Sequence, residues 1–198
     1  MIANAAVVAA GYGSGSLPFG YWIVKLLRDA DIRTLGSKNT GATNVWRSFG
    51  SRLGIATLLL DLAKGAVPAL AGVLVGGSSV GVLAGAAAVL GHSYPALLGF
   101  GGGKGVATGA GVLLAVAPIC FGVAVAVFAV ALVVGRFVSV ASMLGAVAGL
   151  ATAIATDQPG PVLAFCGIVG GFVIVRHRAN IGRLLARTEP RISLRKSA

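Results

Sequence analysis

One stretch decides the fold: residues 106–134 read VATGAGVLLAVAPICFGVAVAVFAVALVV, with no charged side chain. About 20 consecutive apolar residues are enough for a helix to cross the hydrocarbon core of a bilayer. This stretch is longer than that, and it contains Pro118, a residue type that ends or kinks helices. It therefore crosses a membrane either once, as one long tilted helix, or twice, as two short helices that meet near Pro118.

Further apolar runs flank this stretch, with short polar segments between them. They cover residues 5–27, 53–75, 80–99, 139–156 and 161–175. Hydrophobic residues make up 57% of the chain and charged residues 11%, whereas soluble domains carry about 25% charged residues. Composition and patterning together predict an all-α, polytopic membrane protein that forms a single domain over residues 1–198.

The basic residues decide between one crossing and two. The net charge is +11, and basic loops mark the cytoplasmic side of a membrane protein. Two crossings place these loops on one side: Arg28, Arg33, Lys38, Arg47, Arg52, Lys104, Arg136 and the tail from Arg176, which includes Arg195 and Lys196. One crossing would put the tail opposite the first loop. We therefore predict seven transmembrane helices, with the N-terminus outside, the C-terminus inside and a cytoplasmic tail from about residue 177.

Composition also argues against several classes of partner. Aromatic residues make up only 7% of this basic chain, and its long apolar runs favour a membrane over nucleic acid as its environment. Cys120 and Cys166 lie inside apolar runs, without the spacing of a metal site or a disulfide framework. We expect no nucleic-acid partner, no metal site and no cofactor.

A first polar cluster covers residues 36–47, which read GSKNTGATNVWR. It combines small residues, hydroxyls and the two amides of Asn39 and Asn44 with the cations Lys38 and Arg47. Glycines let backbone N–H groups approach an anion, and a guanidinium can form two parallel hydrogen bonds to a phosphate. The cluster is therefore either a phosphate-binding loop or an ordinary solvated connection.

A second cluster, residues 101–108, reads GGGKGVAT and precedes an apolar helix. Amide groups at a helix N-terminus attract anions, and Lys104 adds a full positive charge. Leu98 and Gly105 break the Walker A pattern, and Val106 breaks the dinucleotide-binding pattern. ATP and NAD are therefore not indicated, whereas a smaller phosphorylated molecule is; the alternative is a flexible turn.

A third cluster, residues 176–180, reads RHRAN at the end of the last apolar run. If the helix continues, His177 and Asn180 share one face. The neighbouring arginines favour the neutral imidazole, which suits a base or a hydrogen-bonding group. The alternative is an interfacial histidine flanked by arginines that reach towards the headgroups.

A few polar residues lie within or beside the apolar runs. Asp61 and Lys64 are three residues apart on one helix face near the middle of one run. They either pair with each other as a purely structural feature or brace the polar site. We expect His92 to be a buried hydrogen-bonding residue. Ser139 and Ser142 follow Arg136 and are predicted to lie near the same membrane face as the clusters.

Together these segments resemble the bacterial acyl-phosphate:glycerol-3-phosphate acyltransferase family, known as PlsY. The matching segments are residues 36–45, Gly91–His92 with residues 102–108, and residues 177–181; the resemblance covers about residues 13–189. Lys38, Gly101 and Ala179 stand where the family commonly has Gly, Lys and Glu. These departures lie beside the matched residues and bear on substrate affinity more than on the type of reaction.

The resemblance implies a fold, a location and a reaction. Members have seven helices in the bacterial cytoplasmic (inner) membrane, with the three motifs facing the cytoplasm. They transfer a fatty acyl group from acyl phosphate to the 1-hydroxyl of glycerol 3-phosphate. The products are 1-acyl-sn-glycerol 3-phosphate (lysophosphatidic acid) and phosphate, in the first acylation step of phospholipid synthesis.

The resemblance also implies roles for individual residues. Six positions match the family's active site, and the glycine segment matches its glycerol 3-phosphate site. We assign catalytic roles to Ser37, His177 and Asn180. We assign substrate binding to Arg47, Lys104, Ser142, Asn39, Asn44, Gly102, Gly103, Gly105 and Thr108.

These residues permit direct acyl transfer without an acyl-enzyme, because an acyl phosphate is already activated. Either His177 or the donor's own phosphate would take the hydroxyl proton, while Ser37 orients the donor and Asn180 bonds the acceptor. The main rival is a small membrane transporter of phosphorylated solutes, which predicts polar residues at the midplane of several spans. A scaffold subunit is a third interpretation, but it leaves the first cluster unexplained.

Overall fold

The computed structural model describes residues 1–193, all of them in helices, turns or loops. Arg195 and Lys196, two of the predicted cytoplasmic basic residues, lie outside this range. The helices of the described part are α1 (Ile2–Gly15), α2 (Phe19–Arg28), α3 (Ala42–Phe49), α4 (Ser51–Ser93), α5 (Val106–Val116), α6 (Pro118–Gly135), α7 (Val138–Ala155), α8 (Gly160–Arg176) and α9 (Arg178–Leu185), with short 3₁₀ turns at Ile32–Thr34 and Ala96–Leu98. The all-α prediction is confirmed for these residues.

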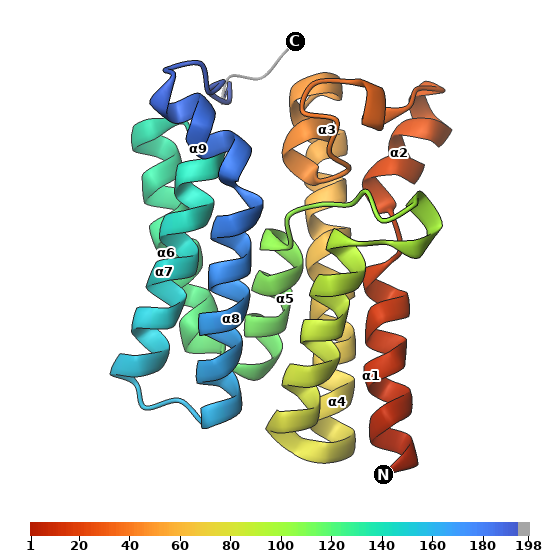
Figure 1. Ribbon diagram of the computed structural model, residues 1–198, viewed down its shortest axis with the longest axis vertical. Helices are drawn as coiled ribbons and strands as arrows, with labels where there is room; N and C mark the ends of the chain where they lie inside the picture. Colours follow the sequence, from red (N-terminus) through yellow and green to blue (C-terminus); the bar gives the residue numbers. More distant parts are fainter. Residues whose placement is uncertain (194–198) are drawn as a thin grey trace.

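The deciding stretch forms two helices, α5 and α6, that run in opposite directions (Figure 1). The break is at Ala117, whose φ of −152° and ψ of 71° are not helical. Pro118 then starts α6, a position where proline's missing N–H costs nothing and its fixed φ suits the helix. Of the two arrangements open to this stretch, the structure has the pair of shorter helices.

Helix α4 is a hairpin rather than one straight rod. Gly76 and Gly77 have non-helical dihedral angles, and Gly77 has a φ of 75°, which glycine adopts at little cost. The two arms pack closely, because a Cβ atom at Gly72 would lie 2.7 Å from the carbonyl oxygen of Val80. The predicted runs 53–75 and 80–99 are therefore the two arms, although the second arm ends at Ser93.

The predicted first run, residues 5–27, is broken in the middle. α1 ends at Gly15 and α2 begins at Phe19, because Pro18 cannot donate the backbone hydrogen bond that a continuous helix needs. α2 is amphipathic, with Leu26 81% exposed and basic residues in its last turn. It is therefore a separate helix at the end of the bundle, so the apolar run of residues 5–27 forms two helices rather than one.

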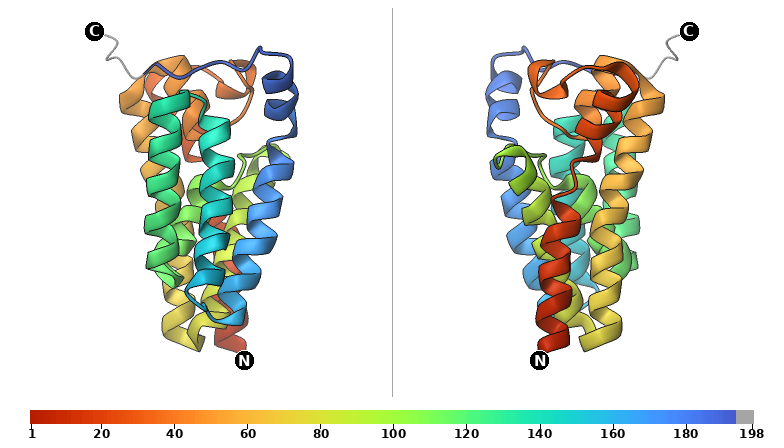
Figure 2. Two further views of the ribbon diagram at one scale, coloured as in Figure 1. Left: turned by 90° about the vertical axis from the view of Figure 1, so that its left-hand side faces the viewer. Right: turned by 90° about the vertical axis from the view of Figure 1, so that its right-hand side faces the viewer.

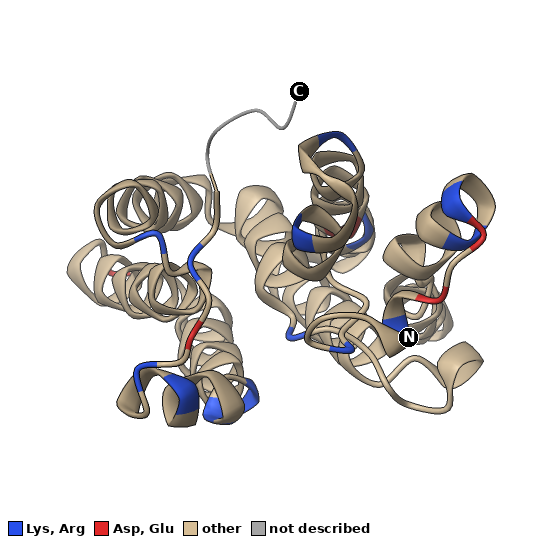
Figure 3. Cartoon of the chain, turned by 90° about the horizontal axis from the view of Figure 1, so that it is seen from above, with Lys and Arg blue, Asp and Glu red and all other residues tan. Residues whose placement is uncertain are grey.

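The long helices α1, α6, α7 and α8 and both arms of α4 run along the long axis of the molecule, with the shorter α5 among them (Figures 1 and 2). Helices α2, α3 and α9 gather at the end opposite the N-terminus. The turns at the other end, residues 76–79, 117 and 156–159, contain no Lys or Arg. Within residues 1–193 the basic residues thus lie at the end that Figure 3 views from above, apart from Lys64 inside the bundle.

Length and composition identify three helical segments of the described chain that can cross a membrane: Ser51–Leu98, Pro118–Gly135 and Val138–Ala155. A fourth is counted if α8 and α9, which meet at an angle of 53°, form one bent span. α5 has 11 residues, and at 1.5 Å per residue it is about 16 Å long. The bundle therefore combines long spans with a short apolar helix that lies beside the polar loops.

Candidate active site

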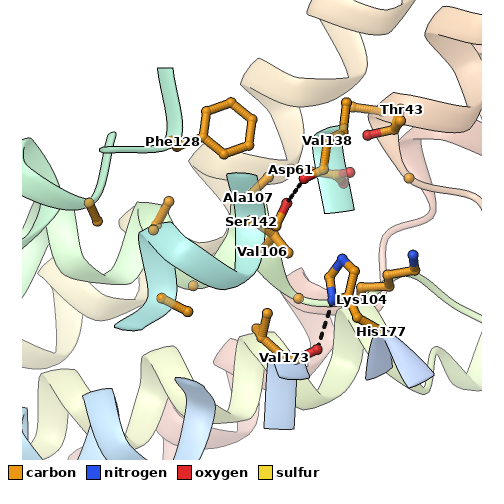
Figure 4. A pocket seen from close by; sticks show the side chains of 18 of the residues that line it. Thr43, Asp61, Lys104, Val106, Ala107, Phe128, Val138, Ser142, Val173 and His177 are labelled. Carbon is orange, nitrogen blue, oxygen red and sulfur yellow. Dashed lines mark hydrogen bonds between the residues drawn. The ribbon is translucent and has the colours of Figure 1, made fainter. Parts of the chain in front are cut away.

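The three polar clusters converge on one cavity of about 380 Å³ at the basic end of the bundle (Figure 4). Its polar wall combines residues from the first loop, the glycine segment, the start of α7, the α8–α9 junction and the tail. These residues are Ser37, Asn39, Asn44, Arg47, Lys104, Ser139, Ser142, His177, Asn180 and Glu189, and Thr43, Asp61 and His92 of α3 and α4 also border the cavity. Segments far apart in the sequence thus form one site, as the motifs predicted.

A direct contact joins the second cluster to the third. Lys104 Nζ donates a hydrogen bond to Asn180 Oδ1, and Asn180 Nδ2 donates to Glu189 Oε1 over 2.7 Å. The same carboxylate accepts hydrogen bonds from Ser139 Oγ at 2.8 Å and Arg183 Nε at 2.7 Å. Glu189 is therefore the centre of a network that fixes Asn180 and, through it, the Lys104 ammonium group.

Sequence reasoning missed Glu189 as a site residue. It lies in a tail of basic residues, and its partners come close only because the chain bends at His177 between α8 and α9. Burial raises the pKa of this carboxyl group, but hydrogen bonds from Asn180, Ser139 and Arg183 outweigh burial and hold the pKa below its usual value. The one available signal was an isolated acidic residue among many cations.

The Lys104 ammonium group is held in a partly desolvated position. Burial, the largest cause, lowers the pKa of Lys104 to about 8; Glu189 opposes this shift and three nearby arginines add to it. Lys104 is therefore mostly charged at pH 7 and loses its charge within the weakly alkaline range. An incoming phosphate would supply the negative charge that this group lacks.

His177 occupies the junction of α8 and α9 and is 3% exposed. Its Nδ1 lies 2.8 Å from the carbonyl oxygen of Val173, which can only accept, so the ring proton is assigned to Nδ1 and Nε2 keeps its lone pair. Burial and the nearby Lys104 lower the pKa of His177 to about 4. The imidazole is neutral, as predicted, with burial as the main cause; Figure 4 shows it between Lys104 and Ser142.

The two asparagines of the first loop organise backbone. Asn44 Nδ2 donates to the carbonyl oxygens of Ile32, Leu35 and Asn39, and its Oδ1 accepts from Ser37 N at 3.0 Å. Both amides are thus engaged, since Asn39 accepts from the Gly41 amide and donates to the carbonyl oxygen of Gly102. They hold the loop that presents the neighbouring side chains to the cavity.

Ser37 and Arg47 are the first-loop side chains best placed for a ligand. Ser37 is exposed and borders the cavity. Arg47 Nη2 donates to the carbonyl oxygen of Pro190 over 2.8 Å, while its buried Nε has no partner among the described residues. Burial lowers the pKa of Arg47, and Glu189 opposes that shift. Arg47 therefore brings a buried hydrogen-bond donor to the polar wall.

The glycine segment only partly lines the cavity. Lys104 and Gly105 border it, whereas Gly102, Gly103 and the buried Thr108 lie behind its wall. The N–H group of Gly103 donates to the carbonyl oxygen of His92 at 2.9 Å, so it is not free for a phosphate. A Cβ atom at Gly103 would overlap the His92 ring, and this close approach explains the need for glycine there.

The tail residues 186–193, here called the closing segment, cross the top of the site. Besides Glu189, the segment supplies the Pro190 carbonyl that accepts from Arg47, and Ile192 N donates to the carbonyl oxygen of Arg136 over 2.9 Å. The Ile192 side chain is buried. The closing segment thus ties α3, the α6–α7 turn and α9 together.

Asp61 and Lys64 pair with each other inside the bundle. Lys64 Nζ lies 2.9 Å from Asp61 Oδ1 and also donates to the carbonyl oxygen of Leu17 at 2.9 Å. His92 Nδ1 lies 3.6 Å from the same Asp61 oxygen. This cluster therefore joins the α1–α2 break to both arms of the α4 hairpin.

Below the polar wall the cavity continues between apolar helices. Its lower part is lined by residues of α4 to α8: Leu58, Leu59, Leu62, Leu113, Phe121, Ala124, Val125, Phe128, Gly145, Ala146, Gly149, Leu150, Phe165, Val169 and Gly170. Such a surface gains free energy by contact with a hydrocarbon chain. Membrane-length helices that enclose a cationic pocket joined to an apolar groove define a class: membrane proteins that handle a phosphorylated molecule together with an acyl chain.

Comparison with known proteins gives the family. A sequence profile described as "Glycerol-3-phosphate acyltransferase" matches residues 5–187. Relatives with that name include one from Hyphomonas neptunium, 46% identical over 97% of this chain and 94% of the relative, and one from Bacillus cytotoxicus, 40% identical over 93% of each. The chain therefore belongs to the glycerol-3-phosphate acyltransferase family.

Solved structures of PlsY share the fold. The crystal structure of its glycerol 3-phosphate form is 40% identical in sequence, with a TM-score of 0.92 and coverage of 96% of both chains. The lysophosphatidic acid form is 38% identical, with a TM-score of 0.89 and coverage of 96% of this chain and 95% of that one. Both are described as an integral membrane acyltransferase, and this chain has the same integral-membrane fold.

Proposed function

We propose that the protein is an acyl-phosphate-dependent glycerol-3-phosphate acyltransferase. It forms lysophosphatidic acid and phosphate in the first acylation step of phospholipid synthesis. One observation carries the proposal beyond family membership: Lys104 contacts Asn180 in a cavity whose polar end continues into an apolar groove. A phosphorylated headgroup and a fatty acyl chain therefore fit the same cavity end to end.

The reaction requires the polar end to hold two phosphate groups. Lys104 and Arg47 supply the positive charge, and the Gly105 segment starts α5, whose N-terminus favours anions. Burial strengthens these contacts relative to water. Ser142 completes the side chains of the proposed substrate-binding set. The other members are proposed to act indirectly: Asn39 and Asn44 hold the backbone of the first loop, and Gly102, Gly103 and Thr108 form the backbone around Lys104.

The proposed chemistry is direct transfer. The 1-hydroxyl oxygen of glycerol 3-phosphate bonds to the acyl carbon, the bond from that carbon to the phosphate oxygen breaks, and the hydroxyl proton leaves with the phosphate. His177 Nε2 accepts a hydrogen bond from the hydroxyl and orients it, because an imidazole with a pKa of about 4 is a poor proton acceptor. Ser37 orients the donor phosphate, and Asn180 bonds the acceptor.

A pair of substitutions separates the two proton routes. His177→Gln keeps an amide oxygen that accepts a hydrogen bond, whereas His177→Ala keeps none. Proton transfer to the donor phosphate predicts that His177→Gln retains clearly more activity than His177→Ala. Equal losses in both variants would instead assign the proton to His177.

The acyl chain is proposed to enter from the bilayer into the apolar groove, so membrane lipid surrounds the site during turnover. The proposal places seven transmembrane helices in a bacterial inner membrane as a single domain. The N-terminus is outside, and the active site and the tail from about residue 177 face the cytoplasm. The positive-inside rule supports this orientation, since the basic loops gather at the active-site end. Accessibility labelling of Arg136→Cys and Asp157→Cys tests it: these positions should react from opposite faces of sealed vesicles.

Phosphate release from acyl phosphate is the direct test of function. Purified protein should release phosphate only when glycerol 3-phosphate is present and should form lysophosphatidic acid in equal amount. Release without the acceptor would contradict acyl transfer to glycerol 3-phosphate. The transporter alternative gains no support from the Asp61–Lys64 pair, because the two charges neutralise each other inside the bundle.

A further inference from the structure

Arg176, the last residue of α8, is bound to the glycine segment and not to the cavity. Its Nη2 donates to the carbonyl oxygen of Gly103 over 2.8 Å and lies 3.4 Å from that of Gly102. Its guanidinium carbon lies 5.2 Å from the centre of the Tyr94 ring. All these contacts fall on the segment that leads from α4 to Lys104, and Arg176 does not border the cavity.

The same short backbone is held from two other directions. Asn39 Nδ2 donates to the Gly102 carbonyl at 3.2 Å, and Gly103 N donates to the His92 carbonyl at 2.9 Å. Gly103 therefore has both its amide and its carbonyl engaged. Because Lys104 is the next residue, the direction of its side chain depends on this fixed peptide.

Arg176 is also covalently adjacent to His177. The side chain of Arg176 holds the glycine segment, while its backbone leads directly into the junction that carries His177 and, one turn later, Asn180. Besides the Lys104–Asn180 hydrogen bond, the Arg176 side chain gives a second hydrogen-bonded link between these two parts of the site. A substrate that competes for Lys104 would break the Lys104–Asn180 bond but leave Arg176 in place.

We propose that Arg176 is a positioning residue that sets the Lys104 ammonium group relative to His177 and Asn180. This inference rests on the proposed function, because it assigns Lys104 to the glycerol 3-phosphate headgroup. One guanidinium nitrogen, Nη2, donates to both carbonyl groups, while the guanidinium lies over the Tyr94 ring. A lysine ammonium cannot reproduce that geometry, so charge alone does not suffice.

The test compares Arg176→Lys and Arg176→Gln with the matched control Arg178→Gln, an exposed arginine two residues later. Both Arg176 variants should raise KM for glycerol 3-phosphate by about 10- to 100-fold, because they lose hydrogen bonds from a charged donor. The alkaline limb of the pH–rate profile should also move above pH 8, because a displaced Lys104 is better hydrated and its pKa returns towards the usual value. Arg178→Gln should change neither quantity.

A purely structural role for Arg176 would lower the amount of active enzyme but leave KM and the alkaline limb unchanged, and that result would overturn the proposal. If Arg176→Gln does not fold, Tyr94→Leu removes the contact with the guanidinium, together with the edge contact between Tyr94 and Phe172, and should produce the same two shifts at smaller size. Failure of the proposed function is distinguishable, since wild-type protein would then form no lysophosphatidic acid. An active wild type with unaltered Arg176 and Tyr94 variants would contradict only this inference.

Discussion

The molecule contains two buried lysines, and their surroundings differ. Lys64, inside the bundle, has a carboxylate and a backbone carbonyl as partners and is 5% exposed. Lys104, at the basic end, has one neutral amide oxygen as its partner and borders the cavity. A charge whose partners are complete has no capacity left for a ligand. A charge with incomplete partners is poised to bind one, so the comparison separates a structural lysine from a substrate-binding lysine.

The difference extends to the neighbouring residues. Around Lys64, Asp61 and His92 connect α1 to both arms of α4. Around Lys104, Arg47 borders the same cavity and has a buried Nε atom without a partner in the described part of the chain. The cationic pocket thus carries surplus donors and positive charge, whereas the inner cluster is balanced. The experiments below test whether this contrast holds.

The largest effect is expected at the balanced cluster. Asp61→Asn leaves the buried Lys64 charge without a carboxylate, and removing one partner of a buried ion pair costs about 3–5 kcal/mol. Thermal unfolding of the detergent-solubilised protein measures the loss. The double variant Asp61→Leu/Lys64→Met should recover most of it, because no charge then remains unpaired; a double variant as unstable as the single one would contradict this interpretation.

Lys104→Gln is expected to affect activity and not the fold. Loss of a buried charge contact to a phosphate costs about 2–5 kcal/mol, so kcat/KM for glycerol 3-phosphate should fall by about 30-fold or more. The unfolding temperature should stay close to that of the wild type, since Lys104 has no carboxylate partner. A large fall in thermal stability would show that Lys104, like Lys64, is mainly structural.

The pH profile provides the third comparison. With a pKa of about 8, protonated Lys104 is lost as pH rises, so kcat/KM should fall about fivefold between pH 8 and pH 9. Below about pH 6 activity should fall because the substrate phosphate takes up its second proton. His177, with a pKa of about 4, adds no limb above pH 5. Lys104→Arg, which stays charged, should remove the alkaline limb; an unchanged limb would assign it to another group.

The smallest expected effect concerns the apolar groove. A Cβ atom at Gly149 of α7 would lie 3.6 Å from Leu113 and 3.7 Å from Ala124, so Gly149→Leu places its side chain in the groove. The preference for short over long acyl phosphates should rise by about tenfold. Gly167→Leu is the control, because no atom lies within 4 Å of a Cβ atom there. Equal shifts in both variants would contradict a groove that measures chain length.

Much of the architecture followed from patterns that the sequence displays directly. Pro118 within an uninterrupted apolar run indicated the α5–α6 break. Two helices were predicted there rather than one, because only two crossings put all the basic loops on the same side of the membrane. The break at Pro18 was underestimated, because the apolar pattern continues through it. The Leu17 carbonyl accepts a hydrogen bond from Lys64, far away along the chain, and single-run patterns do not reveal such a partner.

The residues of the site could be predicted from the sequence, but not which of them face the cavity and which hold the backbone. Residue type and spacing brought out Lys104, His177 and Asn180. The engagement of Asn39 and Asn44 with backbone depends on loop geometry that spacing does not specify. The same holds for Glu189, whose partners Asn180 and Arg183 reach it only after the chain has turned at the α8–α9 junction.

The closing segment has a consequence for the time at which the protein becomes active. Glu189 and the Pro190 carbonyl follow every helix of the bundle in chain order, and they fix Asn180 and Arg47. During synthesis the ribosome must pass these residues before the polar wall can assemble. A nascent chain whose helices are only partly inserted therefore lacks a finished site, and catalysis begins only after membrane integration has reached this point.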